Sequence, residues 1–498
     1  MQRTSIAFIL VALAALAFSD ISVTTFDPWL ELARLARGLA TPDFFSLPGL
    51  AEAVGNTLGF ALIGMLGAVI SGGFLSLFFA RTPVRLFCAF IRSVHELFWA
   101  FIFMPVTGLN SLCGILAIAV PYAGVLAKVY AEIRQEADQA PAEALPGGTG
   151  TLSAFLYTTL PATYAHLKNY TAYRFECALR SSTILGFIGL PTLGYHLETA
   201  FREGLYSEAA ALLYIFYFMI ISLKVWARAR IIVLPLLAAA FFTSWDTAFS
   251  LDNLIRFFTY DILPWPVRAQ GYYDGTQALD FSLAGVLSWA GDIGLTQALP
   301  GIWHTFLLTQ TALVLTGAFT LAAFVPASRI FFSSRLTVPA HLGLVILRTT
   351  PEYILAYVGL QLWGPSMLPA IFALSLHNGG ILAYLTAKNA DLLALPFDTA
   401  KKRMNRYFYE VLPRCYGRFL AFLFYRWEVI MRESAILGIL GITTLGFYID
   451  SAIAKDHLDT AVLLILVTAL MNMGVDTLSQ KIRTRLKISA HVTGVPGS

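Results

Sequence analysis

Ten ionisable residues lie in or beside long apolar stretches of the chain, and eight of them form Arg/Glu pairs four positions apart. They are Arg92, Glu96, Arg174, Glu176, Arg180, Arg348, Glu352, Arg426, Glu428 and Arg432. A charge inside a bilayer costs about 2.5–3.5 kcal/mol and commonly marks an ion or substrate pathway. Partners at this spacing share one helical face, and the guanidinium fork suits an oxyanion. We interpret these residues as the lining of a translocation path. The alternative is mutual neutralisation between packed helices.

Six glycines follow two of these pairs, three after Glu176/Arg180 and three after Glu428/Arg432. They are Gly186, Gly189, Gly194, Gly438, Gly441 and Gly446. Glycine lets helix backbones approach closely, or lets a helix break where it lines a cavity. Pro191 favours a break in the first set. The pattern indicates a hinge or gate, with tight packing of small residues as the alternative.

These residues belong to an internal repeat. Residues 173–195 align without gaps to residues 425–447, and 12 of the 23 positions are identical. Residues 92–96 also align with 348–352, and residues 124–127 with 380–383. The copies run in the same direction, so we expect parallel repeats related by a pseudo-twofold axis along the membrane normal. We predict a first domain at residues 1–230 and a second at 231–498.

The composition indicates a membrane protein. The chain is 57% hydrophobic and 13% charged, whereas soluble domains are about 25% charged. Spanning segments need about 20 apolar residues and must pair every backbone group internally, so we expect an all-α protein. We predict about 12 spans, six per repeat. The segments are approximately 5–20, 55–80, 86–107, 111–131, 171–195, 208–226, 231–249, 301–325, 341–362, 367–387, 421–447 and 460–478.

The basic residues predict that both termini are cytoplasmic. In that orientation only six of the 34 Lys and Arg residues lie in outer segments, and the basic runs at 401–403 and 481–487 lie inside. The first 20 residues also have the composition of a secretory signal. We expect a retained helix instead, because the matching segment of the second copy, at about 231–249, is internal.

Several function classes find no support in the sequence. No G-x-x-x-x-G-K-[ST] motif occurs, so an ATPase, if one is used, would be another polypeptide. The four cysteines form no C-x-x-C pair. The histidines His95, His304, His341 and His377 are scattered along the chain. We therefore expect a transport subunit and not an enzyme, with no cofactor, no metal site and no nucleic-acid partner.

Two segments of each half carry a family resemblance. Ala142-Glu143-Ala144, with Gly148 and then Leu160-Pro161, resembles the Glu-Ala-Ala loop of permeases from binding-protein-dependent ABC importers. Residues 174–189 and 426–441 are similar to the segment that follows this loop in the phosphonate/phosphite-type permeases. Residues 92–96 and 348–352 resemble the arginine/glutamate helix of the same group. The resemblance covers nearly the whole chain, once per half, as in two fused permeases.

The resemblance implies a type I ABC importer permease in the lipid of a bacterial inner membrane. Its partners would be two copies of a cytoplasmic ABC ATPase and a periplasmic substrate-binding protein, and its cargo a small oxyanion such as phosphonate or phosphite. The implied ATPase-coupling positions are Glu143, Ala144, Gly148, Pro161, Ala400 and Pro413. Two departures are a glutamate shifted by one position in the first loop and an alanine, Ala400, in place of glycine in the second. The alternatives are a fused ABC permease for ferric iron, thiamine or another small molecule, and an ion-coupled secondary transporter.

Overall fold

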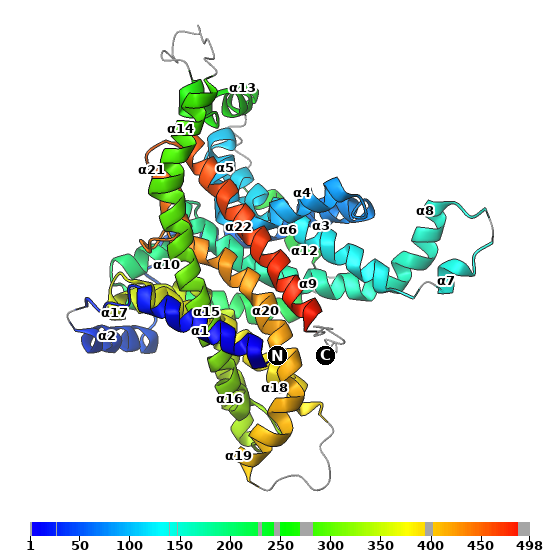
Figure 1. Ribbon diagram of the computed structural model, residues 1–498, viewed down its shortest axis with the longest axis vertical. Coiled ribbons are helices and arrows are strands. Elements are labelled where there is room, and N and C mark those ends of the chain that lie inside the picture. Colours follow the sequence, from blue (N-terminus) through cyan, green and yellow to red (C-terminus); the bar gives the residue numbers. More distant parts are fainter. Residues whose placement is uncertain are drawn as a thin grey trace. The chain divides into compact units, whose positions relative to one another are not determined.

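The computed structural model describes residues 2–25, 27–138, 140–146, 148–227, 232–243, 250–268, 282–393 and 402–486. Within these ranges every regular element is a helix (Figure 1). The predicted all-α class is therefore confirmed for the described part of the chain. Ala400, Lys401 and Lys487 lie outside the described residues, as do residue 231 and residues 244–249 of the predicted span 231–249.

Contacts between helices divide the chain into two units. One unit is Arg34–Leu263, and the other combines Met1–Ala33 with Pro264–Ser498. The helices of the first unit begin within the element α2. They are α2 (Pro28–Ala40), α3 (Leu50–Leu77), α4 (Thr82–Ser93), α5 (Glu96–Thr107), α6 (Ser111–Glu136), α7 (Ala140–Glu143), α8 (Thr151–Ala154), η1 (Phe155–Thr159), α9 (Leu160–Ile184), η2 (Leu185–Ile188), α10 (Leu193–Arg202), α11 (Tyr206–Trp226), α12 (Val233–Phe242), α13 (Leu251–Arg256) and η3 (Phe257–Asp261).

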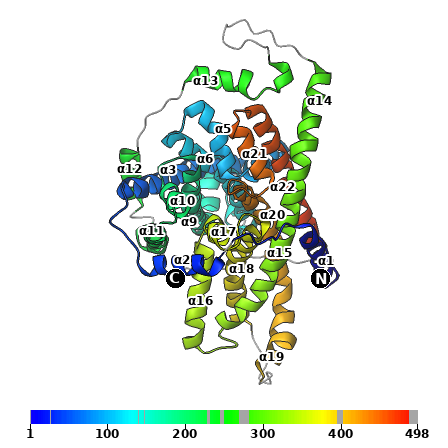
Figure 2. The same ribbon diagram turned by 90° about the vertical axis from the view of Figure 1, so that its left-hand side faces the viewer.

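The second unit repeats most of this order. Its helices are α1 (Gln2–Phe18), η4 (Trp265–Val267), α14 (Leu283–Ile293), η6 (Gly294–Ala298), α15 (Leu299–Ala327), α16 (Ser334–Thr349), α17 (Glu352–Trp363), α18 (Met367–Asp391), α19 (Arg403–Asn405), η7 (Arg406–Val411), α20 (Leu412–Leu437), α21 (Leu445–Ala454) and α22 (Leu458–Arg485). Figure 2 shows α14 running into α15 along one long axis. Together with the turn η6 between them, these two helices cover the 45 residues of Leu283–Ala327. At 1.5 Å per residue this is about 67 Å, more than twice the bilayer core.

Six helices of the described residues are long and apolar enough to cross a membrane. They correspond to the predicted spans 55–80, 111–131, 208–226, 301–325, 367–387 and 460–478. The predicted span 86–107 is instead a pair of helices, α4 and α5, bent by 94° at the break between them. The segment 341–362 is likewise broken, between α16 and α17.

The predicted spans 171–195 and 421–447 are not continuous helices either. The helix α9 ends at Ile184 and gives way to the 3₁₀ turn η2, and α10 starts only at Leu193. The helix α20 ends at Leu437, and α21 starts at Leu445. In both copies the glycines break the helix where hydropathy alone predicted one rod.

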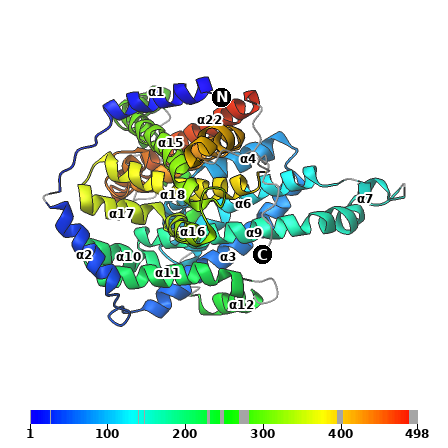
Figure 3. The ribbon, with the colours of Figure 1, turned by 90° about the horizontal axis from the view of Figure 1, so that it is seen from below.

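The first helix of each sequence repeat packs with helices of the other repeat. Figure 3 shows α1 beside α15. The ring of Phe8 in α1 lies 5.1 Å from that of Phe424, and the Ser5 hydroxyl accepts a hydrogen bond from Tyr416 at 2.7 Å. The helix α12, which opens the second sequence repeat, packs on α3 in the unit Arg34–Leu263. The division at 230/231 describes the sequence repeat and stays a prediction.

Three π-helical turns share one cause. The turns η1, η6 and η7 each end directly before a Leu-Pro pair. The prolines are Pro161, Pro300 and Pro413. Proline has no backbone N–H to donate to the carbonyl four residues earlier, so the regular α-helical hydrogen bond is missing. The preceding residues form the wider π-helical turn instead. Two of these turns, η1 and η7, follow the predicted ATPase-coupling loops.

Candidate translocation site

The glycine segment of the first copy forms a tight turn between α9 and α10. A Cβ built on Gly186 would overlap the backbone nitrogen of Tyr195, and one on Gly194 would overlap the carbonyl oxygen of Thr183. Between them, Gly189 has a φ of 91°, which L side chains rarely adopt. Two of these glycines therefore allow backbone contact, and the third allows the chain to reverse.

The second copy builds the same turn. Gly441 has a φ of 85°. A Cβ on Gly438 would overlap the nitrogen of Phe447, and one on Gly446 would overlap the carbonyl oxygen of Ala435. The backbone nitrogens of Gly189 and Gly441 each lie 3.0 Å from the carbonyl oxygen three residues earlier. Close backbone packing and a helix break therefore occur together in each copy, and the hinge or gate role of these glycines stays a prediction.

A buried threonine ties each turn to the preceding apolar helix. The Thr57 hydroxyl in α3 accepts a hydrogen bond from the Leu193 amide at 3.0 Å and donates to the Ala53 carbonyl at 2.7 Å. The Thr305 hydroxyl in α15 accepts one from the Leu445 amide, also at 3.0 Å. These bonds satisfy the first amide of α10 and of α21, which has no partner within its own helix.

The predicted pairs 92/96 and 348/352 do not share a helical face. Arg92 lies in the last turn of α4, and Glu96 is the first residue of α5. Arg348 ends α16 in the same way, and Glu352 starts α17. Residues four positions apart share a face only in an unbroken helix, so the predicted shared face is wrong for these two pairs.

The cause of the break differs between the copies. In the first copy His95 caps α5, because its Nδ1 accepts a hydrogen bond from the Leu97 amide at 3.2 Å. In the second copy Pro351 occupies this position, and a proline disfavours helical geometry at the preceding residue, Thr350. The other predicted pairs, at 176/180 and 428/432, each lie within one continuous helix, α9 or α20.

The site arginines lie at partly buried positions. They are Arg92, Arg174, Arg180, Arg348, Arg426 and Arg432. Two of them lie over tyrosine rings. The Arg174 guanidinium is 5.2 Å from the Tyr170 ring centre, and its Nε donates to the Tyr170 hydroxyl at 2.8 Å. The Arg348 guanidinium is 4.8 Å from the ring centre of Tyr384. Such contacts stabilise a guanidinium that is partly removed from water.

Glu96 is the centre of a polar cluster in the first copy. Ser181 of α9 donates a hydrogen bond to its Oε1 at 3.2 Å, and the Tyr122 hydroxyl of α6 lies 3.1 Å from the same serine oxygen. The His95 Nε2 is 3.5 Å from the Glu96 Oε2. Three helices therefore meet at one carboxylate through hydroxyl groups.

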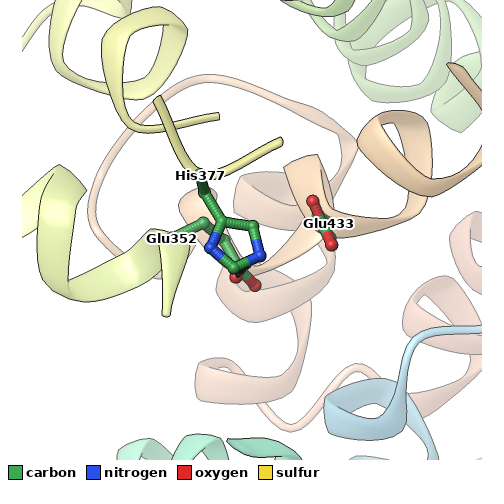
Figure 4. Close-up of side chains that lie close together, drawn as sticks. All are labelled: Glu352, His377 and Glu433. Atoms are coloured by element: carbon green, nitrogen blue, oxygen red, sulfur yellow. Dashed lines mark ion pairs between the residues drawn. The ribbon is translucent and has the colours of Figure 1, made fainter. Parts of the chain in front are cut away.

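Glu352 is the centre of the corresponding cluster in the second copy (Figure 4). Its Oε2 lies 3.9 Å from Nε2 of His377 in α18. Glu433 of α20 is the third member, and ligand atoms of the three residues lie within 4.8 Å of one another. The Glu433 Oε2 accepts a hydrogen bond from Nδ2 of Asn378 at 2.8 Å. Arg426 donates to the amide oxygen of the same asparagine at 3.3 Å.

The sequence reasoning missed His377 and Glu433. It treated the histidines as scattered and expected no metal cluster, because these two residues and Glu352 are far apart along the chain. The repeat contained a usable signal. The gapless alignments place Glu433 opposite Ser181 and His377 opposite Pro121. Both differences put a metal-ligand type of side chain only in the second copy.

The predicted coupling loop is exposed where the structure describes it. Glu143 ends the short helix α7, Ala144 follows it, and Gly148 has a φ of 99°. Pro161 and Pro413 lie in the first turns of α9 and α20. All five of these residues are exposed in the structure.

The exposed apolar side chains of the two loops match position by position. In the first copy they are Leu152, Leu156 and Tyr157, with 70%, 45% and 81% of their surface exposed. In the second they are Met404, Phe408 and Tyr409, with 66%, 51% and 80%. Each residue of the second set lies 252 positions after its counterpart, the same offset as the glycine turns. Exposed apolar groups of this kind face either lipid or a protein partner.

Curated proteins with similar sequences are permeases. The phosphate-import permease protein PhnE of Mycolicibacterium smegmatis is 26% identical over 464 residues, which are 86% of this chain and 84% of that protein. The phosphite transport system permease protein PtxC of Stutzerimonas stutzeri is 28% identical over 229 residues, 44% of this chain and 83% of that protein. No family model matches the chain, and no solved structure matches it.

A further relative, PhnE2 of Escherichia coli (strain K12), is named for a cryptic phosphonate transport system permease. It is 32% identical over 99 residues, 20% of this chain and 81% of that protein. The chain thus matches the Mycolicibacterium smegmatis permease along most of its length. The other two relatives are shorter, and most of each aligns to less than half of this chain. This chain belongs to the phosphonate- and phosphite-type permeases of ABC transporters.

Proposed function

We propose that this chain is the fused membrane subunit of an ATP-driven importer for a phosphorus oxyanion. The observation that carries the proposal is the turn between α9 and α10, which recurs between α20 and α21 with the same glycine contacts and the same threonine bond. A structure built twice in one chain supports two permease domains, at residues 1–230 and 231–498. In this proposal they form 12 spans in two parallel repeats around one route.

The cargo is a small anion of the phosphate, phosphite or phosphonate class. The printed names of the relatives support this class, because they refer to phosphate import, phosphite transport and phosphonate transport. The six partly buried arginines supply the chemistry, since a guanidinium binds a tetrahedral oxyanion through two parallel N–H groups. Arg180 and Arg432, at equivalent positions of α9 and α20, are the residues that we assign to the path. The glycine turns at 186–194 and 438–446 act as its hinges.

The partners follow from the loops and from the orientation. The matched apolar groups before Pro161 and Pro413 support docking of two copies of a cytoplasmic ABC ATPase, one on each loop. Both termini are then cytoplasmic, as the distribution of basic residues indicates. A periplasmic substrate-binding protein delivers the cargo on the opposite face of the inner membrane. The chain itself contributes no catalytic residue, and ATP hydrolysis belongs to the separate subunit.

Transport by the reconstituted complex tests this function. The chain is placed in proteoliposomes with its ATPase and binding protein, and uptake of ³²P-labelled phosphate is measured with unlabelled phosphite, methylphosphonate or sulfate as competitor. We expect uptake that needs ATP and the binding protein and that phosphite or methylphosphonate reduces. A matched complex with a hydrolysis-deficient ATPase should show none. Uptake that persists without the ATPase and stops with an ionophore would instead establish a secondary transporter.

A further inference from the structure

The second copy carries a buried group of metal-ligand side chains that the first copy lacks. Glu352 opens α17, His377 lies in the middle of α18, and Glu433 lies in the last third of α20. Only 6% of Glu352 and 1% of His377 are exposed. We propose that these three residues bind a divalent transition-metal ion that ties the three helices together.

The orientation of His377 fits a metal ligand. Its Nδ1 lies 2.8 Å from the Thr350 carbonyl oxygen. A carbonyl can only accept a hydrogen bond, so Nδ1 carries a proton, and in the neutral ring the lone pair is on Nε2. The Nε2 atom lies 3.9 Å from the Glu352 Oε2. Histidines that bind metals are held in this way, by a backbone carbonyl on the nitrogen that does not bind the metal.

Glu433 is also supported from outside the group. Asn378 donates a hydrogen bond to its Oε2 at 2.8 Å, and Arg426 holds the asparagine by its amide oxygen at 3.3 Å. The Asn378 amide therefore holds one oxygen of the Glu433 carboxylate and so orients that carboxylate. Ligating carboxylates are commonly hydrogen-bonded in this manner.

Electrostatics gives the group a reason to bind a cation. Two carboxylates in one site repel each other, and Glu352 is buried while Glu433 is partly buried. The first copy avoids this conflict, because Ser181 stands where the second copy has Glu433 and donates a neutral hydrogen bond to Glu96. A divalent ion between Glu352 and Glu433 lowers this repulsion.

The donor set indicates which ions fit. One imidazole nitrogen and two carboxylate oxygens suit Zn²⁺, Mn²⁺ or Fe²⁺ better than Ca²⁺, which takes six to eight oxygens. Ligands about 2.1 Å from a tetrahedral ion lie about 3.4 Å apart. The present ligand atoms lie within 4.8 Å, so small rotations of the two glutamate side chains bring them into place. The fourth position is left for water or another oxygen ligand.

Metal titration of the intact permease tests the proposal. The full-length chain is purified in lipid nanodiscs, stripped with a chelator and titrated with Co²⁺, whose visible bands report a tetrahedral site, with Zn²⁺ as competitor. We expect one saturable ion per chain. Glu433→Ser, which installs the residue of the first copy, and His377→Gln should each weaken binding at least tenfold. Glu96→Gln, at the position equivalent to Glu352, is the matched control and should bind as the original protein does.

Two further measurements separate loss of the site from loss of the fold. Zn²⁺ should raise the melting temperature of the original protein and of Glu96→Gln but not that of Glu433→Ser. With Mn²⁺ bound to the original protein, electron spin-echo spectroscopy should detect one imidazole nitrogen. Absence of a saturable ion, equal affinity in all variants, or a bound ion without nitrogen coupling would each overturn the proposal. No ATPase or cargo is present in these assays, so their outcome is independent of the proposed transport function.

Discussion

Replacing Gly194 by alanine tests whether backbone contact holds the repeated turn together. The new Cβ would overlap the Thr183 carbonyl oxygen, which belongs to the backbone of α9 and cannot rotate away. Overpacking costs about 1–3 kcal/mol, and the upper value applies because two backbone segments must separate. Alanine returns about 1 kcal/mol of helix propensity in α10. We therefore expect a net loss of about 2 kcal/mol.

The measurement compares matched glycine variants of the purified protein. Gly73 lies within α3, and a Cβ there would meet nothing within 4 Å. Gly73→Ala should therefore be neutral or should stabilise the protein by up to about 1 kcal/mol. Gly446→Ala, at the equivalent turn, should lose as much as Gly194→Ala. Reversible unfolding in mixed micelles gives the free energies. A Gly194→Ala protein as stable as Gly73→Ala would refute the close-contact reasoning.

Three other predictions address the turn, the path and the coupling loop. Thr57→Val should cost about 1–3 kcal/mol, because it leaves a buried amide of α10 unpaired, whereas Thr57→Ser should keep the bond and most of the stability in the same unfolding assay. Arg180→Ala and Arg432→Ala should each reduce oxyanion uptake at normal protein abundance, and a fall in abundance alone would assign these arginines to folding. Glu143→Lys should raise the ATP hydrolysed per ion transported, and Tyr157→Ala should weaken ATPase binding about tenfold, as expected for loss of an exposed aromatic anchor. An unchanged coupling ratio, or unchanged affinity, would remove those residues from the interface.

The helical class was predicted correctly, and six of the predicted spans coincide with helices long and apolar enough to cross a membrane, because long apolar runs depend on local pattern. The parallel layout of the repeats stays a prediction. The sequence reasoning failed where a helix ends inside an apolar run. Hydropathy does not register the break before Glu96 or the turn after Ile184. A local signal was present in the second copy, because Pro351 disfavours helical geometry at the residue before it. This signal would have corrected the pair at 348/352, whereas histidine is not among the preferred capping residues and gave no such signal at 92/96.

The cluster around Glu352 could not be predicted from local pattern. His377 and Glu433 come from different helices, and only packing of α17, α18 and α20 brings them within 4.8 Å of the glutamate. For the same reason, the sequence did not predict which helices pack on α1 and α12, the first helices of the two sequence repeats. The sequence shows that α1 and α12 are apolar, but it does not show which helices cover them.

The two copies differ in a way that bears on mechanism. The turn between α9 and α10 is retained between α20 and α21, because its glycines touch backbone atoms and tolerate no side chain. The polar clusters, whose groups are side chains, diverged. Both glutamates lie beside an imidazole, but the first copy adds the hydroxyls of Ser181 and Tyr122, whereas the second adds the carboxylate of Glu433. Duplication in one chain allows this divergence, since each copy of a homodimer would carry the same residue. In the proposed importer the two hinge turns are therefore equal, whereas the charged groups at Glu96 and Glu352 differ between the halves.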